Sequence, residues 1–415
     1  MNVWIVNPFD PLPGEAEHEG RYASLARLLA ARGHTVTWWT SDYSHRFKRP
    51  VDQAAILAAC RPLGLGVRFL SAPPYARNIS LARLRNHRRL VRAFAAEAAR
   101  EPHRPEVVVA SAPPPVLARE AVRCAHARGG KAVVDVQDLW PEAFRPLLPL
   151  PGFLATALLW PWQRASRQAY AEADALIGVA DEFVARAVEL AGHKAIAETI
   201  PLGVDLAAFD RAVAAGRCER FTKPPGETWL VYGGSLTHNY DCLTLLEAAV
   251  RLKARLASPW RLFLAGRGEM EATAAEFIRQ RGLTNVTLTG FLALEPYAYL
   301  LSQCDAAFNP VSLGQPIFLP GKVFHYMAAG VAVLNSGPGQ CGRIVSEARI
   351  GLNYEAGSAD SCAAAAERLL GDLSACKAMG AAARRLAETR YDRKVLYLRY
   401  AEVIERLGGN PSRTG

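Results

Sequence analysis

The sequence predicts an α/β protein made of two Rossmann-like β/α/β domains. The chain has 415 residues, which is more than a single hydrophobic core usually organises. Short apolar runs of the kind that form buried parallel strands occur at residues 2–6 and again at residues 229–232. Each run leads into a loop, an amphipathic helix and a further strand, so the same pattern opens both halves of the chain.

The boundary between the domains is predicted from residues that interrupt regular structure. Lys223-Pro224-Pro225-Gly226 extends neither a strand nor a helix. We therefore place a linker at residues 206–225, a first domain at residues 1–205 and a second domain at residues 226–390.

Composition excludes several classes of protein. Half of the residues are hydrophobic, yet no apolar run reaches the ~18–20 residues that a membrane helix requires. The first residues enter a strand directly, without the basic and apolar regions of a signal peptide. The eight cysteines are scattered without metal-binding spacing, and we interpret them as reduced. We expect a cytoplasmic protein without a metal centre.

The net charge of +10 is concentrated in one region. Ten arginines and only two acidic residues lie from Arg61 to Arg104, and residues 81–100 form a basic amphipathic helix. This helix suits the surface of an anionic bilayer, and equally a solvated helix packed on the sheet. Residues 153–162, rich in Leu and Trp, are a second candidate for membrane contact or for the core. No nucleic-acid motif accompanies the arginines, so nucleic acid is not an expected partner.

Residues 310–339 carry the strongest functional signal. An apolar strand is followed by a loop rich in Pro and Gly, a short helix that Gly330 ends, and another buried strand. Lys322 lies at the start of this helix, beside the positive end of its dipole. Loops at the carboxyl ends of parallel strands bind ligands, and this combination of a lysine, a helix start and glycines suits a phosphate.

The residues around Lys322 also carry a family resemblance. Leu-Pro-Gly-Lys-Val-Phe-His-Tyr-Met-Ala-Ala-Gly resembles the donor-site motif of glycosyltransferase family 4, in the branch that builds O-antigens and exopolysaccharides. Asp-Leu-Trp-Pro-Glu and Ile-Pro-Leu-Gly-Val-Asp resemble further motifs of that branch in the expected order. The resemblance implies the GT-B fold, in which two Rossmann-like domains face an inter-domain cleft and a last helix, here 391–410, packs back on the first domain.

Two positions depart from the family pattern. His325 stands where the family usually carries an acid, and the position of an earlier family glutamate falls near Ile317. A neutral imidazole still offers one donor and one acceptor to a ribose hydroxyl. The departures fit a donor sugar with fewer hydroxyls, and they fit an altered or inactive transferase equally well.

The resemblance and the local chemistry together give a set of candidate site residues. On the donor side these are Gly233, Gly234, Gly266, Arg267, Phe291, Lys322 and His325. On the acceptor side, Gly20 and Arg21 help to shape the gap between the domains. Asp138 and Glu142 are catalytic candidates, because a carboxylate at the strand ends can orient an acceptor hydroxyl. A capping Asp and a surface Glu are the equally weighted alternative.

We therefore expect a hexosyl- or N-acetylhexosaminyl-type glycosyltransferase. It would move a sugar from a nucleotide-diphosphate donor, with UDP as the nucleotide, to a lipid-linked or polysaccharide acceptor in cell-surface glycan biosynthesis. The resemblance implies a retaining mechanism, and the lack of an Asp-x-Asp pair predicts transfer without a metal or other cofactor. The expected location is the cytoplasm, with peripheral contact to the inner face of the plasma membrane. A nucleotide-sugar epimerase on the same scaffold and a non-catalytic sugar-binding relative are the alternatives.

Overall fold

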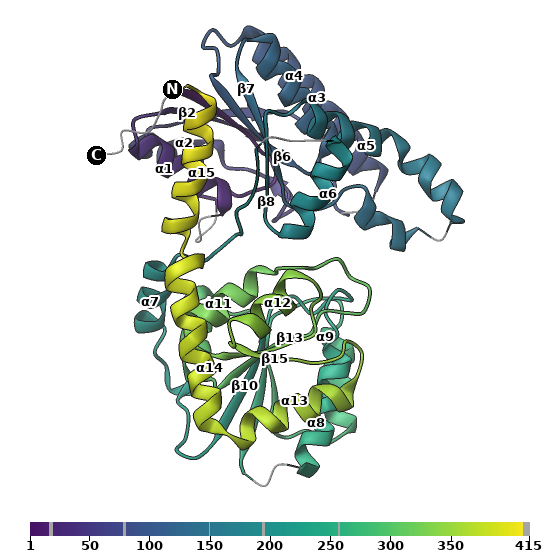
Figure 1. Ribbon diagram of the computed structural model, residues 1–415, viewed down its shortest axis with the longest axis vertical. Helices are drawn as coiled ribbons and strands as arrows, with labels where there is room; N and C mark the ends of the chain where they lie inside the picture. The colour runs from purple at the N-terminus through teal and green to yellow at the C-terminus, as the bar shows by residue number, and fades with distance from the viewer. Residues whose placement is uncertain (16–19, 78–79, 149, 193–195, 256–257, 410–415) are drawn as a thin grey trace. The chain divides into compact units, whose positions relative to one another are not determined.

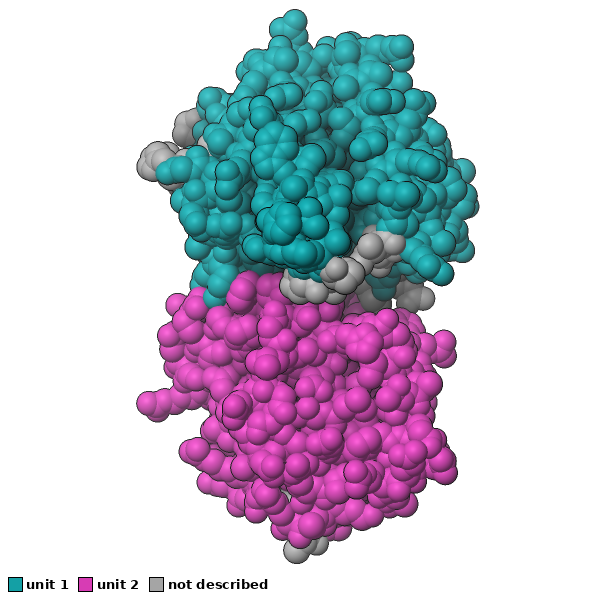
Figure 2. All heavy atoms as spheres, turned by 90° about the vertical axis from the view of Figure 1, so that its right-hand side faces the viewer, with its two compact units in different colours: residues 1–201, 396–415 teal, residues 202–395 magenta. Residues whose placement is uncertain are grey.

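The protein consists of two compact units (Figure 2), each with its own parallel sheet. Unit 1 comprises residues 1–201 and 396–415, and unit 2 comprises residues 202–395. The structure is a computed structural model, which describes residues 1–15, 20–77, 80–148, 150–192, 196–255 and 258–409.

Unit 1 is built on a seven-stranded parallel sheet with the order β5-β2-β1-β6-β7-β8-β9. Its central strands are buried on both faces, which explains why they are nearly continuous apolar runs in the sequence. A short antiparallel pair, β3 and β4, lies outside this sheet. The strands are β1 Asn2–Val6, β2 Thr35–Ser41, β3 Tyr43–Ser44, β4 Arg49–Pro50, β5 Leu65–Leu70, β6 Val107–Ala112, β7 Lys131–Val136, β8 Ala175–Gly178 and β9 Ala197–Thr199.

Helices flank the sheet of unit 1 (Figure 1). In α3 the buried residues recur every three or four positions and the arginines between them face solvent, so one side of this helix packs on the unit. The N-terminal half of α5 projects beyond the sheet. The helices are α1 Arg21–Ala31, α2 Gln53–Cys60, η1 Arg61–Leu63, α3 Leu81–Arg100, α4 Pro115–Ala127, η2 Glu142–Leu147, α5 Gly152–Glu172, α6 Asp181–Ala191 and most of α15 Arg393–Leu407.

Unit 2 has a six-stranded parallel sheet with the order β12-β11-β10-β13-β14-β15. The strand order reverses between β10 and β13, so the loops that follow these two strands diverge and leave room for a ligand. The strands are β10 Thr228–Gly233, β11 Trp260–Ala265, β12 Val286–Gly290, β13 Ala306–Asn309, β14 Ala332–Asn335 and β15 Gly351–Asn353.

The helices of unit 2 include one in the segment that the sequence predicted as a linker. Residues 206–215 form α7, which packs against α10, so this segment belongs to the body of unit 2. The helices are α7 Leu206–Ala215, η3 Glu219–Phe221, α8 Cys242–Arg255, α9 Glu271–Gln280, α10 Leu294–Gln303, α11 Gly321–Ala329, α12 Gln340–Glu347, α13 Ala359–Gly371, α14 Leu373–Leu386 and the π-helical turn η4 Ala387–Tyr391. No helix in the described parts of the chain is both long and apolar enough to cross a membrane.

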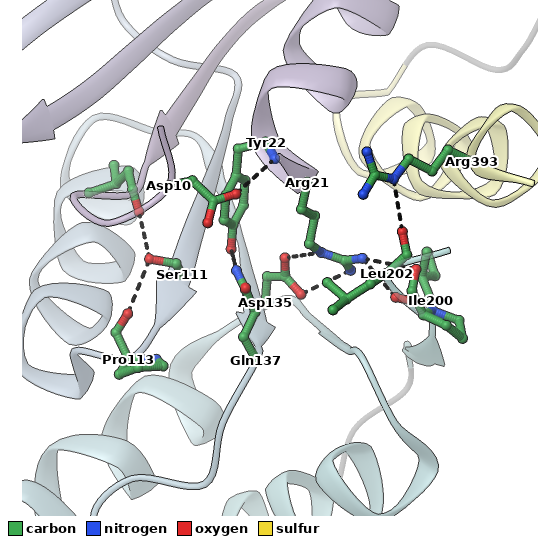
Figure 3. Close-up of polar contacts among 12 residues, drawn as sticks. Asp10, Arg21, Tyr22, Ser111, Pro113, Asp135, Gln137, Ile200, Leu202 and Arg393 are labelled. Atoms are coloured by element: carbon green, nitrogen blue, oxygen red, sulfur yellow. Dashed lines mark hydrogen bonds and ion pairs between the residues drawn. The ribbon is translucent and has the colours of Figure 1, made fainter. Parts of the chain in front are cut away.

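A buried ion pair ties the elements of unit 1 together (Figure 3). Arg21, the first residue of α1, donates to both carboxylate oxygens of Asp135 on β7, at 2.7 and 3.1 Å. Its guanidinium also donates to the Ile200 carbonyl oxygen at 2.8 Å, and Tyr400 of α15 lies against it at 5.0 Å. Both charged side chains are essentially excluded from solvent. The contacts of Arg21 therefore hold together α1, β7, α15 and the residue that follows β9.

The same C-terminal helix makes a second polar contact within unit 1. Glu405 of α15 accepts hydrogen bonds from Arg32 at 2.7 and 2.8 Å, and its carboxylate lies 2.9 Å from a ring nitrogen of His34. The hydrogen bonds from Arg32 lower the pKa of Glu405 below its usual value. Helix α15 is thus bound to the beginning of unit 1 through both its aromatic and its acidic side chains.

We predict that Asp135→Asn destabilises unit 1 strongly. The substitution leaves the Arg21 guanidinium buried without a counter-charge, which typically costs ~3–5 kcal/mol. The matched control is Glu97→Gln, which breaks the exposed pair with Arg100 and should cost ~0–1 kcal/mol. Urea unfolding followed by tryptophan fluorescence measures both values. Equal effects of the two substitutions would contradict a central role for the buried pair.

Candidate active site

A pocket of about 480 Å³ opens in unit 2 where the strand order reverses. Its volume lies within the ~300–1,000 Å³ that is usual for small-molecule sites. Loops that follow β10, β11 and β12 form its walls, together with α10 and α11. The structure brings all of the predicted donor-side residues to this one pocket: Gly233, Gly234, Gly266, Arg267, Phe291, Lys322 and His325.

Lys322 is the cation on the α11 side of this pocket. It is the second residue of α11, and its ammonium lies 3.1 Å from the centre of the Tyr240 ring and 4.3 Å from that of Tyr232. It also donates a hydrogen bond to the Tyr232 hydroxyl at 3.1 Å. Desolvation lowers the pKa of Lys322 well below its usual value, and no carboxylate among the described residues opposes that effect. The contacts of this ammonium group are thus two aromatic rings and a hydroxyl, none of which carries a negative charge.

Two glycines make this placement of Lys322 sterically feasible. Gly234 has a φ of +153°, and a Cβ atom there would come within 2.7 Å of the lysine Nζ. A Cβ atom on Gly266 would overlap with the carbonyl oxygen of Gly234. The loops after β10 and β11 therefore pass close to each other and to the ammonium only because side chains are missing at these two positions.

Gly233 and Gly234 are donor-side candidates because glycines let backbone N–H groups approach a diphosphate, and the structure corrects this expectation. The Gly233 N–H donates to the Tyr326 hydroxyl at 2.9 Å, and the Gly234 N–H donates to the Ala265 carbonyl oxygen at 2.9 Å. Both amides are thus used within unit 2 and do not point at a diphosphate. The start of α11 remains as the backbone contribution to anion binding, because no side chain caps it.

The outer part of the pocket carries a mixed aromatic and cationic surface. Arg267 is exposed, and Phe291 is 66% exposed, which leaves a free aromatic face at the rim. The ring of His325 stacks on Phe209 at 6.0 Å and meets Tyr297 edge-on at 5.9 Å. His325 therefore joins the aromatic wall, and the structure places its ring among aromatic neighbours where the family usually carries an acid.

The residues expected on the acceptor side are found within the body of unit 1. Gly20 immediately precedes α1, and a Cβ atom there would come within 2.9 Å of an Asp10 carboxylate oxygen. Arg21 is only 2% exposed, and its guanidinium is occupied by Asp135 and the Ile200 carbonyl. Arg21 was predicted to help shape the acceptor side of the gap between the domains, whereas its contacts are those of a structural residue. The sequence signal for this role is the aspartate inside the otherwise apolar strand β7.

The two catalytic candidates also have partners within unit 1. Asp138 accepts hydrogen bonds from the Trp140 indole at 3.0 Å and from the Leu139 amide at 2.9 Å, and burial raises its pKa. Glu142 pairs with Arg186 at 2.6 Å. These contacts match the alternative of a loop-capping aspartate and a surface glutamate, except that the glutamate is only partly exposed and is paired with Arg186. A catalytic role for either residue stays a prediction.

Comparison with known protein families identifies the chain. Residues 20–208 match the family described as Glycosyltransferase Family 4, and residues 227–372 match the family described as Glycosyl transferases group 1. The chain is a family 4 glycosyltransferase. The first match lies in unit 1 apart from its last residues, and the second lies in unit 2, so each unit of this glycosyltransferase carries one of the two family signatures. No curated protein sequence matches the chain.

Solved structures share the fold of this glycosyltransferase along nearly its whole length, with low sequence identity. HepE from Anabaena, solved in complex with UDP, is 14% identical with a TM-score of 0.69 and covers 98% of this chain and 100% of its own. Sucrose-phosphate synthase from Thermosynechococcus elongatus is 18% identical with a TM-score of 0.70, covering 98% and 99%. WaaG, a glycosyltransferase involved in lipopolysaccharide biosynthesis, is 15% identical with a TM-score of 0.68, covering 97% and 99%. The fold of this glycosyltransferase is GT-B.

No group of three or more His, Cys, Asp and Glu side chains within the described residues of this glycosyltransferase is arranged to hold a metal ion. Transfer without a metal stays a prediction. Its physical basis is that lysine, arginine and a helix N-terminus can neutralise the phosphates of a nucleotide donor in place of a metal ion.

We predict that Gly266→Ala disturbs the pocket and lowers the stability of unit 2. The new methyl group overlaps with the Gly234 carbonyl oxygen, and the backbone shift that relieves this overlap costs ~1–3 kcal/mol. Gly371→Ala is the matched control, because a Cβ atom there meets nothing within 4 Å. Urea unfolding and the affinity for UDP are measured for both variants. A Gly266→Ala protein that unfolds and binds UDP like the control would rule out the close approach of the two loops.

Proposed function

We propose that this glycosyltransferase binds a UDP-sugar in the pocket of unit 2 and transfers a hexosyl or N-acetylhexosaminyl group. The acceptor is a lipid-linked or polysaccharide glycan of the cell surface, as in O-antigen or exopolysaccharide biosynthesis. The single observation that carries the donor assignment is the ammonium of Lys322, which lies in a ligand-sized pocket without a carboxylate partner among the described residues.

The electrostatics of Lys322 favour an anionic ligand. A desolvated ammonium is costly, and aromatic rings compensate for only part of that cost. A diphosphate supplies the missing negative charge, and its oxygens accept charge-assisted hydrogen bonds from the lysine. The uncapped start of α11 adds a favourable dipole on the same side of the pocket.

The rim of the pocket supports a nucleoside as the other part of the donor. The exposed ring of Phe291 offers a stacking face, and Arg267 offers a second cation that can reach a phosphate. HepE, which shares the fold, has been crystallised with UDP and with UDP-glucose. These observations support UDP as the nucleotide, while the sugar follows only as a class.

The proposed reaction is retaining and independent of metal. The acceptor oxygen forms a bond to the anomeric carbon, and the bond between that carbon and the β-phosphate oxygen breaks on the same face. The acceptor proton passes to the departing phosphate, which leaves as UDP. Lys322 stabilises the negative charge that grows on the leaving group, which is the largest electrostatic demand of such a transfer.

We also propose that unit 1 makes peripheral contact with an anionic membrane on the cytoplasmic side. Arg85, Arg88 and Arg89 of α3 are exposed, and such a row of cations is attracted to anionic lipid. The projecting half of α5 exposes large apolar side chains, among them Phe153 at 73% and Trp160 at 53%. Basic and apolar surfaces of this kind are typical of proteins that bind at a bilayer surface.

We predict that Lys322→Met weakens UDP binding by ~10–100-fold, because a charge-assisted hydrogen bond contributes ~1.5–3 kcal/mol and tenfold corresponds to ~1.4 kcal/mol. Methionine is unbranched and only one atom shorter than lysine, and it removes the charge. The exposed Lys377→Met in the same unit is the matched control and should leave the affinity unchanged. Isothermal titration calorimetry with UDP and GDP measures the affinities, and UDP release with a lipid-linked acceptor measures turnover.

The protonation of Lys322 gives this experiment a second readout. Desolvation depresses the pKa of the free lysine, and a bound diphosphate raises it again. Between these two values, UDP-glucose binding takes up a proton, so the affinity falls as the pH rises through that window. Calorimetry in buffers of different ionisation enthalpy detects the uptake, which Lys322→Met should abolish. An unchanged affinity and an unchanged proton uptake in that variant would remove Lys322 from the donor site.

For the membrane contact, we predict that Arg85→Glu, Arg88→Glu and Arg89→Glu together reduce sedimentation with anionic vesicles. Each cation near such a surface contributes ~1 kcal/mol, so the triple reversal should reduce the partition coefficient by more than tenfold at low salt. Reversal of Arg251, Arg255 and Arg279 in unit 2 is the control for net charge. If both triple variants lose binding equally, the contact depends on overall charge and α3 has no special role.

A further inference from the structure

Unit 1 contains a second pocket, of about 390 Å³, that the donor assignment does not use. Helix α3 forms one wall with Leu81 and Leu84, and α5 forms the other with Leu158 and Trp162. The lining is predominantly apolar, and its volume lies in the ~300–1,000 Å³ range of small-molecule sites. The two segments that the sequence marked as separate membrane candidates, 81–100 and 153–162, thus line one concave site.

One end of this apolar pocket is cationic. Arg83 is only 7% exposed, and its guanidinium lies 4.6 Å from the centre of the Trp140 ring and 5.5 Å from that of Phe9. His87, one turn further along α3, is 2% exposed and also lines the pocket. Neither ring nitrogen of His87 has a hydrogen-bond partner in the described structure. A buried imidazole without a partner is costly, so it indicates a polar ligand that supplies one.

Lys48 is a second cation near Arg83, and its pKa is lowered by burial and by the charge of Arg83. Lys48 lies 4.7 Å from the Tyr75 ring centre and 3.2 Å from a ring nitrogen of His45. Burial, Arg83 and Lys48 lower the pKa of His45 to about 4, and burial, Arg83 and His45 lower that of His87 to about 3. The carboxylate of Asp138 acts on Arg83 from nearby, but its oxygens already accept hydrogen bonds from Trp140 and Leu139. Both imidazoles are therefore neutral at about pH 7, and the repulsion in this cluster is between Arg83 and Lys48, which a bound anion would relieve.

The cationic end lies where an open parallel sheet usually binds its ligand. Phe9 belongs to the loop that follows β1, and Trp140 to the loop that follows β7, so the cluster is at the carboxyl ends of the strands. The apolar end leads away from there to the exposed side chains of α5, including Leu158 at 51%. A ligand that fills both ends must therefore carry an anionic group at one end and a hydrocarbon chain at the other.

We propose that this pocket binds the lipid phosphate of the acceptor, with the hydrocarbon chain between α3 and α5 and the phosphate at Arg83 and His87. This inference rests on the proposed transferase function and selects the lipid-linked acceptor over the free polysaccharide. A polysaccharide can stack on aromatic rings but has no hydrocarbon chain to lie against Leu81, Leu84 and Leu158, and a flat bilayer surface does not reach a buried imidazole. A neutral His87 donates one N–H to the phosphate, and Arg83 supplies the charge.

The test is the binding of farnesyl phosphate, farnesol and inorganic phosphate to the full chain. Farnesyl phosphate should bind at least tenfold more tightly than farnesol, and inorganic phosphate should not saturate at the same concentrations. Arg83→Gln should weaken farnesyl phosphate at least tenfold and leave farnesol unchanged, while Arg83→Lys should retain most of the affinity. If farnesol binds wild-type protein as tightly as farnesyl phosphate does, the phosphate site is refuted.

A substitution at the pocket mouth avoids the risk that a buried arginine is needed for folding. Leu158→Asp changes an exposed residue and should weaken both farnesyl ligands about tenfold. Leu373→Asp, at a similarly exposed leucine of α14 in unit 2, is the matched control and should change neither. Normal farnesyl phosphate binding by Leu158→Asp would overturn the assignment. So would sedimentation with anionic vesicles without any binding of monomeric farnesyl phosphate, because this face would then be a bilayer contact.

The UDP affinity of the same proteins separates this inference from the proposed function. Wild-type protein and the Leu158→Asp variant should bind UDP equally, since the donor pocket lies in unit 2. If UDP binds and farnesyl phosphate does not, the lipid site is wrong and the donor assignment stands. If farnesyl phosphate binds and UDP does not, the lipid site stands and the donor assignment fails.

Discussion

The desolvated ammonium of Lys322 is the constraint around which the pocket of unit 2 is built. Removing a cation from water costs several kcal/mol unless nearby groups replace the lost solvation. Here the ring of Tyr240 at 3.1 Å and the hydroxyl of Tyr232 at 3.1 Å take over part of that role. The lysine can reach these two tyrosines only because Gly234 has no side chain. The loop that contains Gly234 can approach the loop after β11 only because Gly266 has no side chain. Tyrosines, glycines and the start of α11 thus form one arrangement around one charge.

A comparison with Arg21 shows why burial alone does not identify a functional cation. The guanidinium of Arg21 is neutralised by both oxygens of Asp135 and donates to a backbone carbonyl, so its charge is fully used within unit 1. Lys322 is desolvated as well, but its partners are neutral rings and a hydroxyl. A ligand gains little from the first cation and much from the second. The chemistry of the partners distinguishes a structural charge from a binding charge.

The sequence predicted those features that depend on neighbouring residues. Helix α11 ends at Ala329, directly before Gly330, as local signals indicated, although it begins two residues earlier than the predicted Val323. The predicted donor residues all line one pocket. Sequence patterns could not predict hydrogen bonds and ion pairs between residues that lie far apart along the chain. Lys322 and Tyr232 are 90 residues apart, Arg21 and Asp135 are 114 apart, and the tyrosine that occupies the Gly233 amide is 93 away. Such pairs follow from strand order, which no local pattern encodes, and they decided the roles of Arg21 and the glycine amides.

Both pockets hold a cation against aromatic faces, and this choice of partner has a functional consequence. Arg83 lies over Trp140 as Lys322 lies over Tyr240. A carboxylate partner would stabilise either cation more, but it would also repel a phosphate and would have to be displaced on binding. An aromatic ring attracts a cation more weakly than a carboxylate does, and it carries no net charge that would repel a phosphate. Sites that give up some stability in this way are expected where a protein must bind and release an anion, which is the requirement that a nucleotide donor and a lipid phosphate share.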